Sequence, residues 1–525
     1  MFPVRPFPPQ RRFRQSAAPR HAARRRVTLA AERLESRLAL AGLVSVAVSG
    51  DVLTVTGDHD ANAVGIRRGD RGLLSVVALQ QEPLVTAIRG PDGIVGVGTT
   101  LRTPIREIRV RMAGGDDAVE FGTLDEGGAP ATTLGRLDVD LGDGNDSMTA
   151  GSVEVGGMVT IRAGGGNDEI LLRDVRSFSS ILITAGDGDD VVALTSGSGA
   201  LLDVCIDGGA GADQLAVVNG IEVGRRLSAV GGAGTDEVFI GSLVNVHGDL
   251  RIAGGPGDDG IAVADRVQVL GATTLVGGAH ADRIGLAGSV IMDAGLAVAA
   301  GPGDDLVVVT ASVSTSRNVA IGMGTGADRL DVGSGVGWGD APLGASMLVR
   351  GDLVVAKPAG SLVASMEFVA DSRVGRDVVI RSFATTSSVR VRGLEVERDF
   401  MVTTGMADDE VTITETEVSR HLRVQTGGGD DVAMLTTVQV GGDARIETGA
   451  GDDTVEMGNT IARSRLFVLL AAGDDSLRLG GVRMPAAAGP VVLSGGRRGQ
   501  DRLRLEMLAD GVVPPHEDFE TVSVA

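Results

Sequence analysis

Aromatic residues and cysteine are scarce in this 525-residue sequence. Phe, Trp and Tyr together make up 2% of the chain, with one Trp and no Tyr. Such a chain has to build its core from Val, Ile, Leu and Ala, in thin layers rather than in one large globule. The single cysteine, Cys205, excludes an internal disulfide framework. It lies in an apolar run, which predicts a small buried side chain.

Long apolar runs and catalytic signatures are also missing. No stretch approaches 18 uninterrupted apolar residues, so we expect no transmembrane helix. The six histidines are scattered along the chain, which argues against a zinc site. The sequence contains no Ser-His-Asp set, P-loop or other nucleotide motif, and we predict no catalytic residue.

The charge of the chain is strongly uneven. The formal net charge is −21, from 48 Lys and Arg against 69 Asp and Glu. Residues 1–42 contain ten Arg and two Glu, which gives this segment +8 and leaves −29 for the rest. An acidic body repels nucleic acid and attracts cations, so no nucleic-acid partner is expected.

Glycine and aspartate, in contrast, are abundant and regularly spaced. Residues 231–239 have the form G-G-x-G-x-D-x-U-x, where U is a large aliphatic residue. The same form is complete at 208–216 and 254–262, and the three aspartates are 23 residues apart. A fixed period of this length is typical of a solenoid. Looser copies end in Asp117, Asp146, Asp168, Asp190, Asp282, Asp305, Asp328, Asp409, Asp431, Asp453, Asp475 and Asp501.

One repeat predicts three short strands and three corners. Within residues 237–259, strands are expected at 237–240, 244–246 and 249–253, and the glycine-rich turn follows the third. The predicted fold is therefore an all-β, three-sided parallel β-helix with 22–23 residues per coil. Its coils should stack about 4.8 Å apart, with right-handed crossovers.

The chain divides into five predicted parts. Residues 43–112 alternate like strands and should cap the open end of the solenoid. The acidic turns are regular in the third part and resume in the fifth. The parts are a disordered basic tail with an export segment at 1–42, N-terminal cap strands at 43–112, β-solenoid at 113–332, interrupted coils with an insertion at 333–392, and β-solenoid with a C-terminal cap at 393–525.

The interruption separates Asp328 from Asp409 by 81 residues. The Gly-Asp or Arg-Asp pair that precedes the third strand of a coil recurs inside this gap. In complete coils, the turn aspartate lies eleven residues after the Gly or Arg of this pair. Counting eleven residues from Gly351 and from Arg376 gives Leu362 and Ser387. We therefore expect the coils to continue while two of them lack the acidic turn. The only tryptophan, Trp338, falls in the insertion.

The stacked acidic turns predict a calcium site. Carboxylates about 4.8 Å apart would repel by about 3 kcal/mol at an effective dielectric of 20, which favours a bound cation. Carboxylate and carbonyl oxygens in a glycine-rich loop suit Ca²⁺. The alternative is that the turns only cap corners through Asx hydrogen bonds. The predicted ligands are Asp117, Asp146, Asp168, Asp190, Asp213, Asp236, Asp259, Asp282, Asp305, Asp328, Asp409, Asp431, Asp453 and Asp475.

These turns resemble the hemolysin-type, or RTX, calcium-binding nonapeptide. The resemblance implies ions held between turns of neighbouring coils, with the aspartate as side-chain ligand. RTX repeats follow each other every nine residues and load two edges, whereas here each coil carries one motif, so we expect one calcium edge. The glycines of the complete motifs are Gly208, Gly209, Gly211, Gly231, Gly232, Gly234, Gly254, Gly255 and Gly257.

A second resemblance concerns the N-terminal region. Residues 34–41, LESRLALA, resemble the L-E-x-R-x-L-x-A segment that opens many large bacterial repeat proteins thought to be exported. This resemblance implies a bacterial protein of the cell surface or extracellular space.

Two classes of function are compatible with these features. The first is a calcium-stabilised, rod-like structural protein, with an adhesive variant that binds a cell-surface polymer or another surface protein. The alternative is a β-helix polysaccharide lyase or hydrolase. Every carboxylate pair lies in the repeating turn, whereas an active site should be a singular departure from the repeat. The sequence therefore favours a structural protein over an enzyme.

Overall fold

The computed structural model forms strands only. No helix occurs among the described residues, and hence none that could cross a membrane. The predicted tail up to residue 39 and Trp338 lie outside the part that is described. The structure describes residues 40–68, 73–81, 84–122, 132–333, 346–368, 372–383, 385–483, 491–496, 499–506, 516–519 and 521–524.

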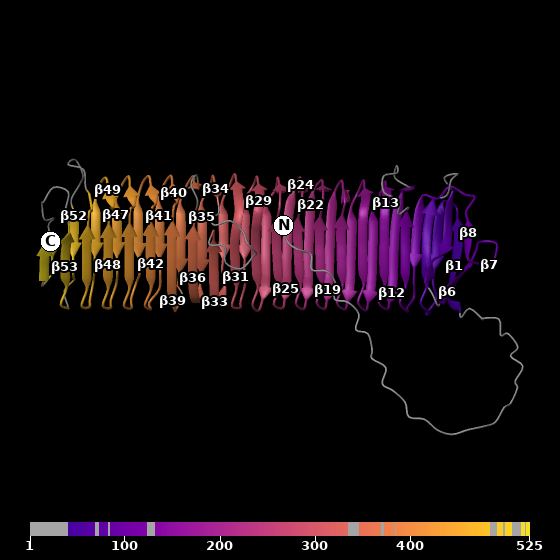
Figure 1. Ribbon diagram of the computed structural model, residues 1–525, viewed down its shortest axis with the longest axis horizontal. Helices are drawn as coiled ribbons and strands as arrows, with labels where there is room; N and C mark the ends of the chain where they lie inside the picture. The colour runs from indigo at the N-terminus through magenta and orange to yellow at the C-terminus, as the bar shows by residue number, and fades with distance from the viewer. Residues whose placement is uncertain are drawn as a thin grey trace, which may run out of the picture.

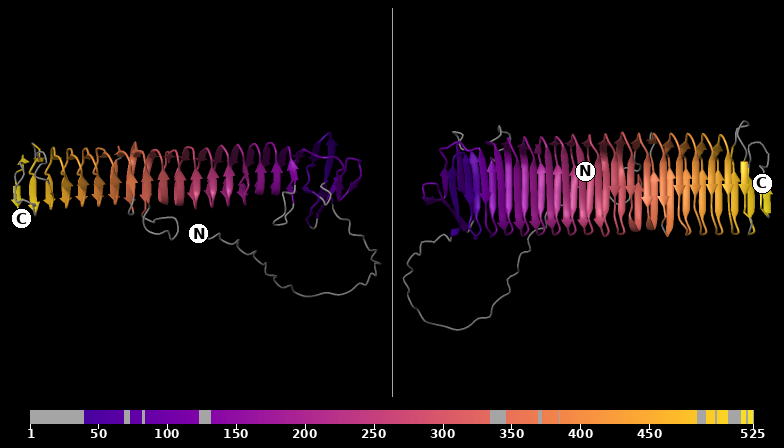
Figure 2. Two further views of the ribbon diagram at one scale, coloured as in Figure 1. Left: turned by 90° about the horizontal axis from the view of Figure 1, so that it is seen from above. Right: turned by 180° about the vertical axis from the view of Figure 1, so that it is seen from behind.

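One coil consists of β23 (Glu237–Gly241), β24 (Val244–Val246) and β25 (Asp249–Pro256). The three predicted strands are confirmed, and β25 is longer than expected because it extends into the glycine-rich turn. Successive coils pair in parallel, and Figure 1 shows them as one rod with the N-terminal strands at one end. Figure 2 shows the same rod from above and from behind. The fold is the predicted parallel β-solenoid; the hand of its crossovers stays a prediction.

The strands that follow the acidic turn form the first stack. Several of its members continue past the next corner, so the first and second stacks share one 32-stranded sheet. The first stack comprises β3 (Ala63–Arg68), β10 (Ala118–Gly122), β13 (Ser147–Val155), β15 (Glu169–Ser177), β17 (Val191–Thr195), β20 (Gln214–Val218), β23, β26 (Gly260–Ala264), β29 (Arg283–Met292), β31 (Leu306–Thr315), β33 (Thr325–Val332), β36 (Ala359–Glu367), β39 (Thr386–Arg392), β42 (Glu410–Thr414), β45 (Val432–Thr436), β48 (Thr454–Gly458), β51 (Ser476–Gly480), β53 (Arg502–Glu506) and β55 (Thr521–Val524).

The second stack is made of very short strands. It comprises β11 (Thr132–Leu134), β18 (Gly199–Ala200), β21 (Ile221–Val223), β24, β27 (Val267–Val269), β34 (Met347–Val349), β37 (Arg373–Val374), β40 (Glu395–Val396), β43 (Glu417–Val418), β46 (Gln439–Val440) and β49 (Ile461–Ala462).

The third stack leads into the acidic turn and belongs to a separate 23-stranded sheet. It comprises β2 (Val52–Thr56), β9 (Glu107–Arg111), β12 (Arg136–Asp143), β14 (Val159–Gly165), β16 (Ile181–Asp187), β19 (Asp203–Ala210), β22 (Arg226–Ala233), β25, β28 (Thr273–Ala279), β30 (Leu296–Ala299), β32 (Val319–Gly322), β35 (Leu353–Lys357), β38 (Val378–Ser382), β41 (Phe400–Thr403), β44 (Leu422–Gln425), β47 (Ala444–Glu447), β50 (Leu466–Leu469), β52 (Val491–Ser494) and β54 (His516–Glu517).

The N-terminal region differs from the coils by its antiparallel pairing. Five antiparallel pairs lie within residues 40–100 of the described chain, and every other pairing there is parallel. This pairing gives the rod a distinct first end. The remaining strands of the region are β1 (Leu40–Ser49), β4 (Leu74–Ala78), β5 (Gln80–Gln81), β6 (Leu84–Arg89), β7 (Val95–Gly96) and β8 (Gly98–Thr100).

The core is a single column of aliphatic side chains enclosed by the three stacks. Alternate residues of each strand point inward, as the strand period of two requires. Val238, Ile240, Leu250 and Ile252 of one coil are each at most 1% exposed. The packing of such residues from one coil onto the next forms the core, in place of the large globular core that a chain with so few aromatic residues does not build.

The coils continue through the interrupted region. Strands β34, β35 and β36 pair in parallel with β31, β32 and β33. Leu362 stands in register with Asp328, and Ser387 in register with Leu362. The prediction that two coils lose the turn aspartate is therefore confirmed, at the positions found by counting.

Candidate metal centre: a buried aspartate ladder

The turn aspartates point into the rod and hold neighbouring coils together. Asp236 lies just before β23, and none of its surface is exposed. Its Oδ1 accepts a hydrogen bond from the backbone N–H of Asp213 at 2.8 Å. Its own backbone N–H donates to Oδ1 of Asp259, one coil further on, at 2.9 Å. Each aspartate thus links the coil before it to the coil after it.

This arrangement, which we call the aspartate ladder, runs in two segments. The first starts at the backbone N–H of Asn62 and ends at Asp328; the second starts at Ser387. All ladder aspartates are at most 3% exposed. The members are Asp117, Asp146, Asp168, Asp190, Asp213, Asp236, Asp259, Asp282, Asp305 and Asp328 in the first segment, and Asp409, Asp431, Asp453, Asp475 and Asp501 in the second.

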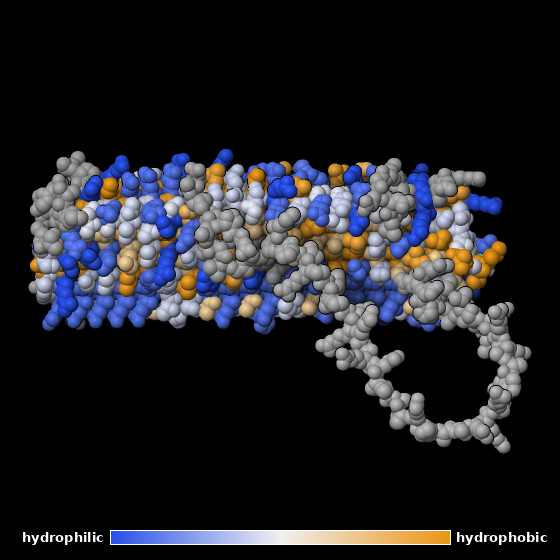
Figure 3. Space-filling model, viewed as in Figure 1, coloured by the Kyte–Doolittle hydropathy of each residue, from blue (hydrophilic) through white to orange (hydrophobic). Residues whose placement is uncertain are grey.

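At many turns the residue before the ladder aspartate forms part of an exposed outer column with the opposite direction. The backbone N–H of Ala281 donates to Oδ1 of Asp258 in the preceding coil at 3.0 Å, and Asp452 donates to Asp430 at 2.8 Å. At these turns the two columns cap two backbone N–H groups, from opposite sides. Figure 3 shows hydrophilic side chains in a row along one long edge of the rod. These hydrogen bonds join residues of neighbouring coils and therefore differ from the local Asx hydrogen bonds considered as the alternative to calcium.

The glycines of the complete motifs serve two different purposes. The second and third glycines have positive φ; in one turn Gly232 has +120° and Gly234 has +139°. A Cβ on Gly257 would overlap the carbonyl oxygen of Gly234 in the preceding coil. The first glycine has no positive φ: a Cβ on Gly231 would lie 2.5 Å from Oδ2 of Asp236. Gly231 therefore leaves room for the ladder carboxylate.

The second carboxylate oxygen of most ladder aspartates has no hydrogen-bond partner among the described residues. Burying a polar atom without a partner is costly, and burying a charge without one is more so. Each of these oxygens therefore requires a proton or a cation. The aspartates concerned are Asp146, Asp168, Asp190, Asp213, Asp236, Asp259, Asp282, Asp305 and Asp475.

Burial raises the pKa of the ladder carboxyls, because the charged form loses its hydration. The carboxylates of Asp146 and Asp190 raise the pKa of Asp168 further, whereas the hydrogen bond from the backbone N–H of Asp146 lowers it. The resulting pKa is about 7 for Asp117, Asp168, Asp282 and Asp475, and about 6 for Asp146, Asp190, Asp213, Asp259, Asp305 and Asp431.

At the end of the first segment the protein supplies its own cation. Lys357 ends β35 and is 1% exposed, and its Nζ contacts Oδ2 of Asp328 in a fully buried ion pair. Met323 occupies the same register position one coil earlier. Lys357 is the only lysine of the sequence, which could have drawn attention to it, but the 29 residues that separate it from Asp328 hide the pairing.

The donor set is compatible with a hard divalent cation. Partnerless carboxylate oxygens beside a glycine-rich backbone are the type of ligand that Ca²⁺ prefers. In the part of the chain that is described, no three His, Cys, Asp or Glu side chains form a group able to hold a metal by themselves. An ion at the ladder would therefore depend on backbone carbonyl oxygens as well as on carboxylates.

Two further features accompany the ladder. The aliphatic residue two positions after the aspartate is buried; Val238 and Ile261, for example, are at most 1% exposed. A second series of acidic caps lies at another corner, where Asp377 donates its N–H to Asp352 and Asp399 donates to Asp377. Those carboxylates face arginines, for example Arg376 near Asp352 at 3.4 Å. That corner is therefore charge-balanced, unlike the ladder.

Comparisons with known proteins return no match: no family model, no curated protein and no solved structure matches this chain. The resemblance of the turns to hemolysin-type repeats rests on the motif alone.

The raised pKa values predict an unusual pH dependence when divalent cations are removed. The folded state binds more protons than the unfolded state, whose aspartates titrate near 3.8. The ladder's contribution to stability is therefore fully present below that pH and is lost as the pH rises through 6 to 7. In EDTA, the melting temperature measured by circular dichroism should fall between about pH 5 and about pH 8.

A control for this prediction replaces three adjacent ladder aspartates, Asp213, Asp236 and Asp259, with Asn. Asn retains the Oδ1 acceptor but does not titrate, so the fall in melting temperature should become smaller. A melting temperature that rises over this pH range in the unaltered chain would contradict the raised pKa values.

The buried ion pair gives a second prediction. Lys357→Met leaves the carboxylate of Asp328 buried without its cation, which typically costs about 3–5 kcal/mol. Hydrogen exchange should show faster opening of the coils around β33 and β35. Adding Asp328→Asn should restore most of the protection, because the amide keeps the Oδ1 acceptor for the N–H of Asp305 and removes the buried charge. Equal exchange in the single and double variants would show that the pairing does not stabilise these coils.

Proposed function

We propose that this protein is a rod-shaped structural protein of the bacterial cell surface or extracellular space, stabilised by Ca²⁺ along the aspartate ladder. The observation that carries the proposal is the row of buried Oδ2 atoms without hydrogen-bond partners. A repeated charge of one sign inside a protein needs compensation at every coil. Calcium would supply that compensation where it is abundant, outside the cell, and would add its binding energy to folding.

The pair between Lys357 and Asp328 supports a cation in preference to a proton. Of the ladder carboxylates, Asp328 is the one that faces a buried ammonium group. There the chain satisfies Oδ2 with a positive charge and not with a hydroxyl or amide donor. The residues that would hold calcium are the ladder aspartates whose Oδ2 has no partner among the described residues, with the backbone of their glycine-rich turns. Their role is to keep adjacent turns at a fixed separation.

The structural role is also supported by where the carboxylates lie. The ladder repeats once per coil through most of the rod, so its carboxylates are a repeated structural element and not a singular pair of acid and base groups. A polysaccharide-acting enzyme, the alternative class, requires such a set. We therefore propose a scaffold that presents its surface to partners, and no catalytic residue.

The test is thermal unfolding in EDTA and in millimolar calcium at neutral pH, followed by circular dichroism. Calcium should raise the melting temperature of the full chain by tens of degrees, because several ions bind only to the folded state. Magnesium should raise it much less, because Mg²⁺ demands a stricter geometry and loses water reluctantly.

Isosteric variants distinguish the stabilising effect of bound calcium from that of the ladder's hydrogen bonds. Replacing both Asp236 and Asp259 with Asn keeps the Oδ1 acceptors but removes two charges, so the calcium-induced shift should shrink while the strand signal stays. Asp249→Asn is the matched control, because Asp249 caps Ala272 at another corner. A melting temperature that calcium does not change in the unaltered chain would refute the calcium role and leave the ladder as a corner cap.

A further inference from the structure

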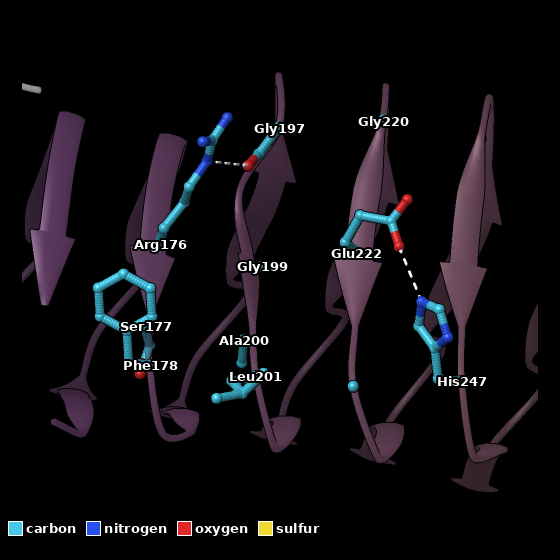
Figure 4. Close-up of a pocket in the computed structure, with 11 residues that line it drawn as sticks. Arg176, Ser177, Phe178, Gly197, Gly199, Ala200, Leu201, Gly220, Glu222 and His247 are labelled. Atoms are coloured by element: carbon cyan, nitrogen blue, oxygen red, sulfur yellow. Dashed lines mark hydrogen bonds and ion pairs between the residues drawn. The ribbon is translucent and has the colours of Figure 1, made fainter. Parts of the chain in front are cut away.

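Besides a hollow of about 430 Å³ beside Lys357 and Phe383 in the interrupted region, a larger hollow opens on the surface of the rod. It has a volume of about 710 Å³, is open to solvent, and lies across the coils between β15 and β24. This volume is within the range of small-molecule sites. Figure 4 shows Phe178 and Leu201 near one another, with Glu222 and His247 in the coils beyond Gly199.

The hollow exists because two successive coils carry glycine where their neighbours carry side chains. Gly197 and Gly220 occupy a corner position with φ of +82° and +84°, and the same position holds Leu243 and Arg266 in the next two coils, with φ of +73° and +66°. No atom lies within 4 Å of a Cβ placed on Gly220. A side chain is therefore tolerated at this corner, and its absence opens the surface.

The walls combine apolar and polar groups. Phe178 and Leu201 occupy matching positions in adjacent coils and are 56% and 61% exposed, which is unusual for large apolar side chains. Glu222 and His247 supply hydrogen-bonding groups, as does Arg176. A ligand that fits must present an apolar face to Phe178 and several hydroxyl or amide groups to the polar residues.

The charged groups of the hollow already have hydrogen-bond or ion-pair partners, which argues against an ionic ligand. The Arg176 guanidinium lies 3.3 Å from Oδ1 of Asp174. Glu222 accepts a hydrogen bond from Nδ2 of Asn245 at 2.6 Å, and Nε2 of His247 lies 3.2 Å from its other oxygen. An anion or cation would have to displace these partners. A neutral, hydroxyl-rich ligand can bind to the groups as they stand.

Added β-strand pairing is also disfavoured at this place. The backbone N–H groups of Gly197, Leu201, Gly220 and Gly224 all donate to carbonyl oxygens of neighbouring coils. An extended peptide that binds by strand addition needs free backbone groups at a sheet edge. Recognition in the hollow therefore has to use side chains.

We infer that the hollow binds one pyranose unit of a neutral polysaccharide. Such a ring has an apolar C–H face for Phe178 and Leu201, and hydroxyl groups that exchange hydrogen bonds with Arg176, Glu222 and His247. The open sides allow the polymer to continue along the rod. Glu222 is the only carboxylate among the lining residues, whereas glycoside hydrolysis requires two, so the site is a binding site. This inference names the surface polymer of the proposed function and rests on that surface role.

The experiment titrates the full chain with neutral hexasaccharides of glucose, mannose and N-acetylglucosamine, observed by calorimetry and by saturation-transfer NMR. At least one should bind with saturation, and Phe178→Ala should weaken it about tenfold. Gly220→Leu should abolish binding because it places in the hollow the residue that the next coil carries at the same corner. Circular dichroism should show an unchanged strand signal for that variant.

Arg266→Leu is the matched control, at the same corner but outside the lining, and should bind as the unaltered chain does. Measuring in EDTA and in calcium separates this proposal from the proposed calcium role: binding in both solutions supports the hollow whether or not calcium stabilises the rod. Three results would overturn the inference: saturation by none of the hexasaccharides, unchanged binding by Gly220→Leu, or preferential binding of acidic hexasaccharides.

Discussion

The hydrogen bond from a backbone N–H to the aspartate carboxylate of the next coil is the interaction on which this structure depends. It fixes the separation of the coils at the glycine-rich turn, where the backbones of adjacent coils approach closely and the glycines have no side chains that could hold them together. The same bond brings a carboxylate inside the protein once per coil. The rod therefore gains regularity from the ladder and acquires a column of groups that are costly to bury as free anions.

That cost explains why the ladder has to be compensated and why its ends are specialised. Protons satisfy the column at low pH, as the raised pKa values indicate. At Asp328 the chain uses the ammonium group of Lys357, and the next two coils carry Leu362 and Ser387 in place of aspartate. The capping of backbone N–H groups between coils and the proposed calcium binding are compatible, since the capping uses Oδ1 and leaves Oδ2 for a cation.

Most of the fold could be predicted from the period of the sequence. The 22–23-residue spacing sets the coil, and the alternation of Val, Ile and Leu sets the strands, because parallel stacking repeats identical positions. Even the positions Leu362 and Ser387 followed from counting. The direction of the aspartate side chains did not, because spacing places a residue in a turn without saying which way it points. The pairing of Lys357 and the hollow at Gly197 and Gly220 arise from contacts between different coils. A repeat pattern describes what the coils have in common and therefore does not reveal such contacts.

The most direct test of the calcium ladder is a crystal structure of the protein grown in calcium, with anomalous scattering data. The account predicts a row of anomalous peaks in contact with the Oδ2 atoms of the first segment, from Asp146 to Asp305, and none at the pair formed by Asp328 and Lys357. Continuous density for the ladder with no peak beside any of these oxygens would contradict it, and would mean that protons alone compensate the buried column.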